Sequence, residues 1–221
     1  MVTTPELIEI LIADAKPVRR LRPPLVRAAL WLLLAGFVLL ALAAVYGARP
    51  DLALRLRDPS FAIALAGSLA TGILAAIAAF YLSLPDRSRL WLLLPGPALV
   101  LWISTIGYGC LTDWVSIGPE GIQLGATLQC FTTLLIASVP SFAILVIMLR
   151  HTARLDPTTA AMMAGLASAG IAATALSLFH EFDATVMVLV WNLGAVALIV
   201  ALAGMFGPSL FASTLPRGLD A

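Results

Sequence analysis

The sequence predicts an all-α, polytopic membrane protein with six transmembrane helices and a short cytoplasmic amphipathic helix at the N-terminus. Composition is the first reason, because 61% of the residues are hydrophobic and 11% are charged. The mean hydropathy of +1.02 lies far above that of water-soluble domains. Run length is the second reason, since a bilayer core of roughly 30 Å needs about 20 mostly apolar residues per helix. Six runs of this length occupy Val26–Gly47, Ser60–Leu82, Leu90–Leu111, Ala126–Leu149, Thr158–Phe179 and Ala184–Phe206.

Helices are expected because every backbone N–H and C=O in hydrocarbon needs a partner within the protein. Strands of a barrel would give short alternating segments, whereas these runs are long and uniformly apolar. The N-terminus does not resemble a cleavable signal peptide, since Glu6, Glu9 and Asp14 precede any basic residue. We therefore expect a cytoplasmic N-terminal segment over residues 1–25, a six-helix membrane domain over 26–207 and a short cytoplasmic tail over 208–221.

The basic residues predict the orientation of the chain. Six spans place both termini on one side, and ten of the 13 Lys and Arg residues belong to that side. Because cytoplasmic loops carry the excess of Lys and Arg, both termini are expected in the cytoplasm. The three basic residues on the opposite side are Arg49, Arg55 and Arg57.

The interiors of the spans carry no ionisable residue at their predicted mid-depth. Ion-coupled transporters usually place such residues there, so a small six-helix transporter or metal exporter is the alternative function rather than the first. Pro95, Gly96 and Pro97 interrupt the third span, and Pro140 lies in the fourth; both are expected to bend a helix. Small residues four apart predict close helix packing and permit a homodimer. They are Ala64, Ser68 and Gly72 in the second span and Ala161, Gly165 and Ala169 in the fifth.

The N-terminal segment is predicted to form a helix followed by a basic connector. Thr3, Thr4, Pro5 and Glu6 make a favourable helix start, and apolar residues then recur at helical spacing. Such a stripe fits either an interfacial helix or a helix that docks into a groove on a partner protein. Acidic flanks at Glu6, Glu9 and Asp14 favour a partner with basic surroundings over a membrane surface. The apolar stripe consists of Leu7, Ile8, Leu11, Ile12 and Ala15.

Two cysteines, Cys110 and Cys130, are expected near the periplasmic side, at the outer ends of the third and fourth spans. A buried cysteine is often only a small apolar residue. The functional alternative is a sensor in which oxidation, a disulfide or a bound metal changes the packing of these two helices. Two thiols specify a metal weakly, because a tetrahedral site takes four ligands. Further weak candidates for ligands at the same face are His180, Glu181 and Asp183.

Several stretches occur together along this chain: TPELIEILIADAKPVRRLRPP at the N-terminus, GYGC at 107–110, a cysteine early in the fourth span, and FHEFDATVMVLVWNLG before the sixth. With the six spans, they make the chain resemble the negative-regulator-of-sigma-F family. The resemblance covers essentially the whole chain. It implies a small inner-membrane anti-sigma factor of proteobacteria, which holds an extracytoplasmic-function sigma factor inactive until oxidative or heavy-metal stress releases it. The implied sigma-binding residues are Leu7, Ile8, Leu11, Asp14, Pro17, Val18 and Arg20.

The resemblance also implies a sensing cysteine early in the fourth span, which matches Cys130. It implies a second cysteine directly after the histidine before the sixth span, where this chain has Glu181. That departure weakens a thiol-pair mechanism, and Cys110 is the second candidate. The expected partners are a sigma factor and the lipid bilayer, without direct nucleic-acid binding, because the net charge is +1. No cofactor is expected. The protein is not expected to be an enzyme, since HExxH, GxSxG and glycine-rich phosphate loops are absent from the sequence.

Overall fold

The computed structural model describes residues 3–13, 21–113 apart from Ala48 and Pro85, 124–150 and 157–179, and seven separate positions between Gly194 and Phe206. Across these residues the chain forms helices and connecting turns, without strands. The helices are α1 (Thr4–Ala13), α2 (Pro24–Tyr46), α3 (Leu52–Arg55), α4 (Pro59–Leu82), the 3₁₀ turn η1 (Arg89–Leu93), α5 (Gly96–Asp113), α6 (Leu124–Leu149) and α7 (Pro157–Phe179).

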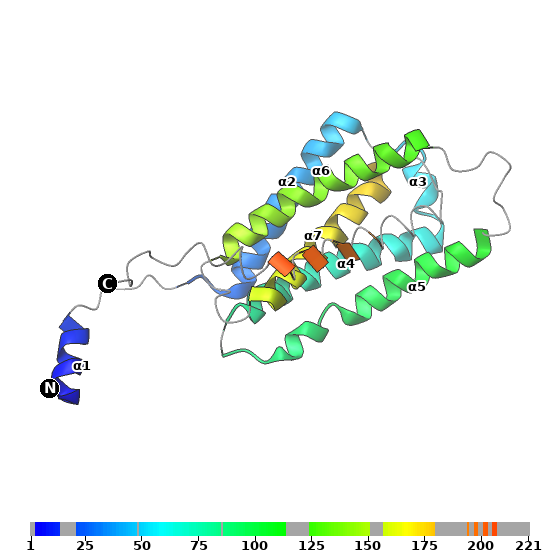
Figure 1. Ribbon diagram of the computed structural model, residues 1–221. Coiled ribbons are helices and arrows are strands. Elements are labelled where there is room, and N and C mark those ends of the chain that lie inside the picture. The colour runs from blue at the N-terminus through cyan, green and yellow to red at the C-terminus, as the bar shows by residue number, and fades with distance from the viewer. Residues whose placement is uncertain are drawn as a thin grey trace.

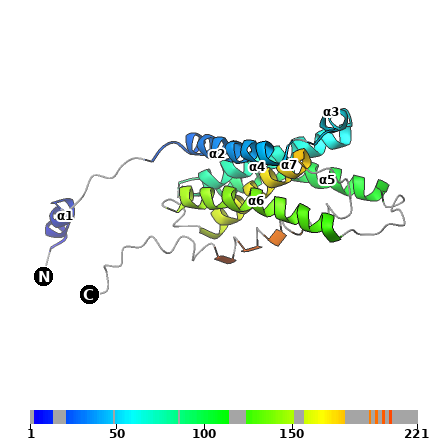
Figure 2. The ribbon, with the colours of Figure 1, turned by 90° about the horizontal axis from the view of Figure 1, so that it is seen from above.

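The five long helices lie alongside one another as an elongated bundle, and α1 lies apart from it (Figure 1). A second view from above shows the same separation of α1 from the bundle (Figure 2). Helix α7 packs against α4, α6 and α2, whereas α5 packs against α4 and η1. In the stretch of α7 that is long enough to cross a membrane, 72% of the residues are buried, compared with 22% in α2. Helix α7 is therefore the centre of the bundle and α2 lies at its edge.

Local sequence explains where the helices begin and end. Pro24 and Pro59 lie in the first turns of α2 and α4, where a missing N–H costs no hydrogen bond. Asp58 caps α4, because its carboxylate accepts hydrogen bonds from the N–H (3.0 Å) and hydroxyl (2.8 Å) of Ser60. Gly47 ends α2 with φ +75°, a conformation that favours glycine.

Close contact between α4 and α7 depends on glycine. An added Cβ on Gly170 would lie 2.7 Å from the backbone nitrogen of Gly72 and 2.9 Å from the carbonyl oxygen of Ser68. The side chains of Ser68 and Thr174 complete the contact, with their hydroxyl oxygens 3.0 Å apart. Ser68 and Gly72 belong to the predicted small-residue stripe of the second span. On α7 the closest approach is at Gly170, one residue beyond the predicted Ala169.

Helix α2 has two faces of different character. Ala28, Trp31 and Ala35 are buried in the bundle, while large apolar side chains such as Phe37 and Leu40 are exposed on the other side. An exposed apolar face of this length suits lipid rather than water. Three helices of the described chain are long and apolar enough to cross a membrane: Pro24–Val45, Pro59–Leu82 and Thr158–Phe179.

Continuous α-helices occupy four of the six expected apolar segments, namely the first, second, fourth and fifth. The third differs in detail, because the expected continuous span from Leu90 consists of η1 followed by α5, which begins at Gly96. Pro95 and Pro97 lack an N–H, so the α-helical hydrogen-bond pattern cannot run through them. Pro140, in contrast, lies within a continuous α6. The sixth segment, Ala184–Phe206, falls mostly outside the described residues.

Candidate functional site

The first turn of helix α1 is capped by hydrogen bonds between Glu6 and Thr3. The Glu6 carboxylate accepts hydrogen bonds from the backbone N–H (2.8 Å) and the hydroxyl (2.9 Å) of Thr3. This is half of a capping box, in which the acid three residues into the helix satisfies the N–H of the capping residue. These bonds, led by the backbone N–H of Thr3, lower the pKa of Glu6. The carboxylate is therefore ionised at neutral pH at the positive end of the helix.

The exposed side chains of α1 are both acidic and apolar. Glu6 and Glu9 are exposed, and Ile12 is 68% exposed. Leu7, Ile8 and Leu11 belong to the helix by their backbone, but their side chains lie outside the described part of the structure. The other predicted sigma-binding residues, Asp14, Pro17, Val18 and Arg20, lie outside the described residues altogether.

Arg27 joins the first turn of α2 to the bundle. It is only 8% exposed, and its guanidinium donates a hydrogen bond to the carbonyl oxygen of Met148 near the end of α6. The same guanidinium lies 4.8 Å from the ring centroid of Phe80, near the end of α4. A cation held over an aromatic ring in a buried place stabilises the contact. Arg27 thus connects three helix ends where the N-terminal segment meets the bundle.

A second contact lies deeper along the same pair of helices. The indole N–H of Trp31 donates a hydrogen bond of 2.9 Å to the carbonyl oxygen of Ser141 in α6, and Trp31 is fully buried. Buried indole groups usually find such a partner, because an unsatisfied N–H in an apolar interior is costly. Trp31 and Arg27 lie four residues apart, so both face α6 from one side of α2.

At the opposite end, the segment after α2 is attached to the end of α7. The backbone N–H of Arg49 donates to the carbonyl oxygen of Leu178 (3.1 Å). Its guanidinium, with a side chain only 2% exposed, makes a two-pronged contact with Asp51 at 2.7 Å and 2.9 Å. The hydrogen bonds from Arg49 lower the pKa of the Asp51 carboxyl. Arg55 also reaches Asp51 at 3.4 Å. Leu178 lies two residues before the predicted ligand segment that begins at His180.

The structure places the cysteines by backbone only. Cys110 lies near the end of α5 and Cys130 near the start of α6, while both side chains are outside the described part. His180, Glu181 and Asp183 lie outside the described residues. No group of three His, Cys, Asp or Glu residues that could hold a metal occurs in the part of the chain that the structure describes. A thiol or metal sensor therefore stays a prediction.

The contacts made by two buried arginines could not be predicted from the sequence. Arg27 is the second residue of the first expected span and Arg49 follows the end of that span, so both looked like charges at a span boundary, yet both are buried. Asp51 is a local partner of Arg49, but the contacts with Met148, Phe80 and Leu178 form only through tertiary packing. The sequence offers only a weak indication of this burial, namely that each arginine lies within a few residues of a helix end.

The fold defines a helical protein with apolar helices of membrane-spanning length and a separate, acidic N-terminal helix. Residues 11–212 match the family model described as negative regulator of sigma F. The chain therefore belongs to this family, and membership implies negative regulation of a sigma factor. No curated protein and no solved structure matches the chain. The family match begins within α1, so Leu7 and Ile8 lie outside it.

Proposed function

We propose that this protein is a membrane-bound anti-sigma factor that holds an extracytoplasmic-function sigma factor inactive through residues 1–25. Residues 26–207 form six transmembrane helices in the bacterial inner membrane, with both termini in the cytoplasm and a short tail over 208–221. The observation that carries the proposal is the placement of α1, a capped helix that lies apart from the bundle (Figures 1 and 2). Family membership supplies the class of partner.

The docking chemistry follows from helical spacing. Leu7, Ile8 and Leu11 occupy one side of α1, so they insert together into an apolar groove of the sigma factor. Exposed Glu6 and Glu9 then lie at the rim and select a groove with basic surroundings. Asp14, Pro17, Val18 and Arg20 direct the chain away from the groove toward α2. Such binding needs no catalytic chemistry, because a covered surface is no longer available to RNA polymerase.

Release belongs to the membrane domain in this proposal. Oxidative or heavy-metal stress acts at Cys130, with Cys110 second, and at the outer face near His180, Glu181 and Asp183. A change there reaches the cytoplasmic end through helix packing. The Arg49 contact with Leu178 supports this route, because it ties the start of the outer segment to the end of the central helix α7. Arg27 supports it at the other end, where it touches α4 and α6.

The test is capture of the sigma factor by the full-length protein in detergent, read by mass spectrometry. The variant Leu11→Asp places a charge within the apolar stripe, and we expect it to lose the partner. The matched control is Ala13→Asp, which adds the same charge on the opposite side of the same helix. We expect this control to retain the partner. Two outcomes contradict the docking proposal: both variants capture the sigma factor, or neither variant captures it and the wild type also fails to do so. Either outcome makes substrate flux the next measurement.

A further inference from the structure

Arg27 holds the start of α2 against the last turns of two other helices. Its guanidinium donates to the carbonyl oxygen of Met148, which lies in the last turn of α6. Carbonyl oxygens of a last turn have no later N–H of the same helix as a donor, and they form the negative end of the helix dipole, so a cation is favourable there. The guanidinium also lies 4.8 Å from the ring centroid of the fully buried Phe80. We call Arg27, the Phe80 ring and the Met148 carbonyl the clasp.

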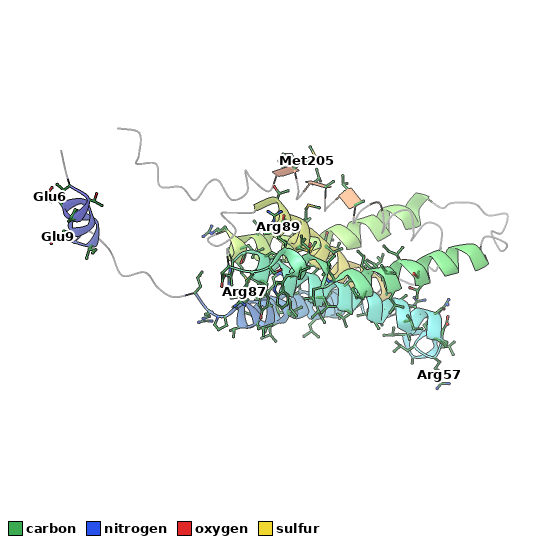
Figure 3. The ribbon with its side chains drawn as sticks, turned by 90° about the horizontal axis from the view of Figure 1, so that it is seen from below. Glu6, Glu9, Arg57, Arg87, Arg89 and Met205 are labelled. Carbon is green, nitrogen blue, oxygen red and sulfur yellow. The ribbon has the colours of Figure 1, made fainter. Side chains whose placement is uncertain are left out.

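The clasp lies at the end of the bundle nearer to α1. Phe80 is two residues before the end of α4 at Leu82. Figure 3 shows Arg87, shortly after this helix, toward the side of α1, and Arg57 at the far end of the bundle. The clasp therefore lies where the N-terminal segment joins the helices.

Few buried residues hold the start of α2 in place. In the stretch of α2 that is long enough to cross a membrane, 22% of the residues are buried. Within residues 24–31 the buried ones are Arg27, Ala28 and Trp31. The guanidinium is thus a large part of what fixes the direction of this end of the helix.

Two prolines make the joint before α2 stiff. Pro23 is extended, with φ −51° and ψ 144°, and Pro24 lies in the first turn of the helix. A proline ring fixes φ, and a residue before proline is restricted to extended values of ψ, so the joint cannot absorb a change of direction by rotation about these bonds. A tilt of the start of α2 is therefore passed on to Leu21 and Arg22. Arg20, the last of the predicted sigma-binding residues, is three residues before Pro23.

Helix α6 extends from the clasp to the other end of the bundle. It is continuous over Leu124–Leu149 and runs through Pro140 without a break. Cys130, the first candidate for the sensing residue, belongs to its early part by backbone. A displacement of this continuous helix therefore moves the Met148 carbonyl that Arg27 caps.

We propose that the clasp sets the direction in which the docking segment, residues 1–25, leaves the membrane domain, with Arg27 as its positioning residue. While Arg27 caps α6, the start of α2 and the joint at Pro23 and Pro24 hold the segment in the arrangement that binds the sigma factor. Movement of Met148 with α6 opens the clasp, and the segment loses this arrangement. The inference rests on the proposed function and adds the residue through which the membrane domain regulates docking.

Paired spin labels measure this direction in the full-length protein in detergent, with Cys110→Ser and Cys130→Ser as the background. The labels are attached through Leu21→Cys, before the prolines, and Leu90→Cys in η1, because these side chains are 57% and 72% exposed. We expect a narrow distribution of distances between the labels, which Arg27→Gln broadens or shifts. Arg27→Lys keeps a cation at the end of α6 and should give an intermediate result. An unchanged distribution with Arg27→Gln would overturn the proposal.

Binding of the sigma factor that the wild type captures shows whether this direction regulates docking. We expect Arg27→Gln to weaken binding about tenfold, within the usual range of coupling between two sites. The control for general destabilisation is Gly170→Ala, which disturbs the α4–α7 contact away from the clasp and should leave binding unchanged. The flexible joint Pro23→Gly/Pro24→Ala should weaken binding by itself and remove the further effect of Arg27→Gln, because a tilt of α2 is then no longer passed on.

Equal weakening by Arg27→Gln and Gly170→Ala would overturn the proposal, because Arg27 would then act through the stability of the fold alone. A full effect of Arg27→Gln in the flexible-joint protein would overturn it as well. The label distances involve no sigma factor. If the wild type binds no sigma factor while the distances respond to Arg27→Gln, the proposed function is rejected and the positioning of the N-terminal segment by Arg27 stands.

Discussion

Gly170 of α7 and Gly72 of α4 approach so closely that an added Cβ on Gly170 would lie 2.7 Å from the Gly72 nitrogen and 2.9 Å from its Cα. The neighbouring atoms belong to the backbone, so they cannot yield as the end of a flexible side chain can. Close approach of this kind lets two membrane helices gain packing contacts where no hydrophobic force drives them together. The contact holds the central helix α7 against α4.

We predict that Gly170→Ala separates α4 from α7 and lowers the free energy of unfolding by about 1–3 kcal/mol, the usual cost of overpacking. The measurement is the unfolding midpoint of the purified protein in detergent, followed by circular dichroism. The control is Gly36→Ala, because a Cβ at that position of α2 meets no atom within 4 Å. Equal midpoints for the two variants would show that the α4–α7 contact tolerates a methyl group.

Arg27 provides a second test, at the end where the N-terminal segment joins the bundle. We expect Arg27→Gln to lose the contact with Phe80 and the hydrogen bond to Met148, and to cost about 2 kcal/mol of stability. The measurement is again the unfolding midpoint in detergent. Arg57→Gln, an exposed arginine at the far end, is the control and should change little. A normal midpoint for Arg27→Gln would mean that the buried guanidinium contributes no net stability.

Stability should depend on pH through Asp51. Hydrogen bonds from Arg49 hold the pKa of Asp51 in the folded protein below its ordinary value of 3.8. A lowered pKa favours the folded state when the carboxyl is ionised, so this contribution is complete above pH 3.8 and is lost as the pH falls through the folded pKa. We expect Asp51→Asn to be less stable than the wild type at neutral pH and to lose less stability on acidification.

Unfolding midpoints measured between about pH 6 and about pH 3 check this prediction. Asp86→Asn controls for the change in net charge, because the Asp86 carboxylate lies 3.8 Å from Arg87, in a largely exposed pair. Parallel acid titrations for the wild type and Asp51→Asn would remove the Arg49–Asp51 pair from the pH dependence.

The sensing residues are tested in the cell. We expect Cys130→Ser to repress the sigma-dependent genes normally in unstressed cells and to respond less to oxidants and heavy metals. Cys110→Ser should have the weaker effect. A reporter gene for the sigma factor measures both variants. Unchanged induction in the two single variants and in the double variant would exclude the thiols from the mechanism.

The helix positions could be predicted from local features of the chain. The expected spans beginning at Val26, Ser60 and Thr158 correspond to α2, α4 and α7 within two residues at each end. These boundaries are set by apolar run length together with prolines and caps such as Asp58, and both act over a single turn. The break before α5 was visible as Pro95 and Pro97, although a bend was expected there rather than a change from 3₁₀ to α-helix.

Less of the candidate site than of the helix positions could be predicted from the sequence. The capped start of α1 follows from Thr3 and Glu6, which are three residues apart. The roles of Leu7, Leu11 and Cys130 stay predictions, because their side chains lie outside the described part of the structure. Arg27 and Arg49 looked like ordinary flanking charges. Their contacts join residues more than a hundred positions apart in sequence, because Arg27 bonds to Met148 and the Arg49 backbone bonds to Leu178.

Apolar run length and composition already establish a helical protein suited to a membrane. The order of the helices from centre to edge is a property of the tertiary structure. Helix α7 has the lowest hydropathy of the three spanning candidates, 1.7, and is the most buried, whereas α2 has the highest, 2.6, and is the least buried. In a membrane the interior favours small and hydroxyl-bearing residues such as Gly170 and Thr174, because close backbone packing and hydrogen bonds between helices hold them together there. Large apolar side chains such as Phe37 and Leu40 lie on the outside of the bundle, so hydropathy alone cannot identify the core.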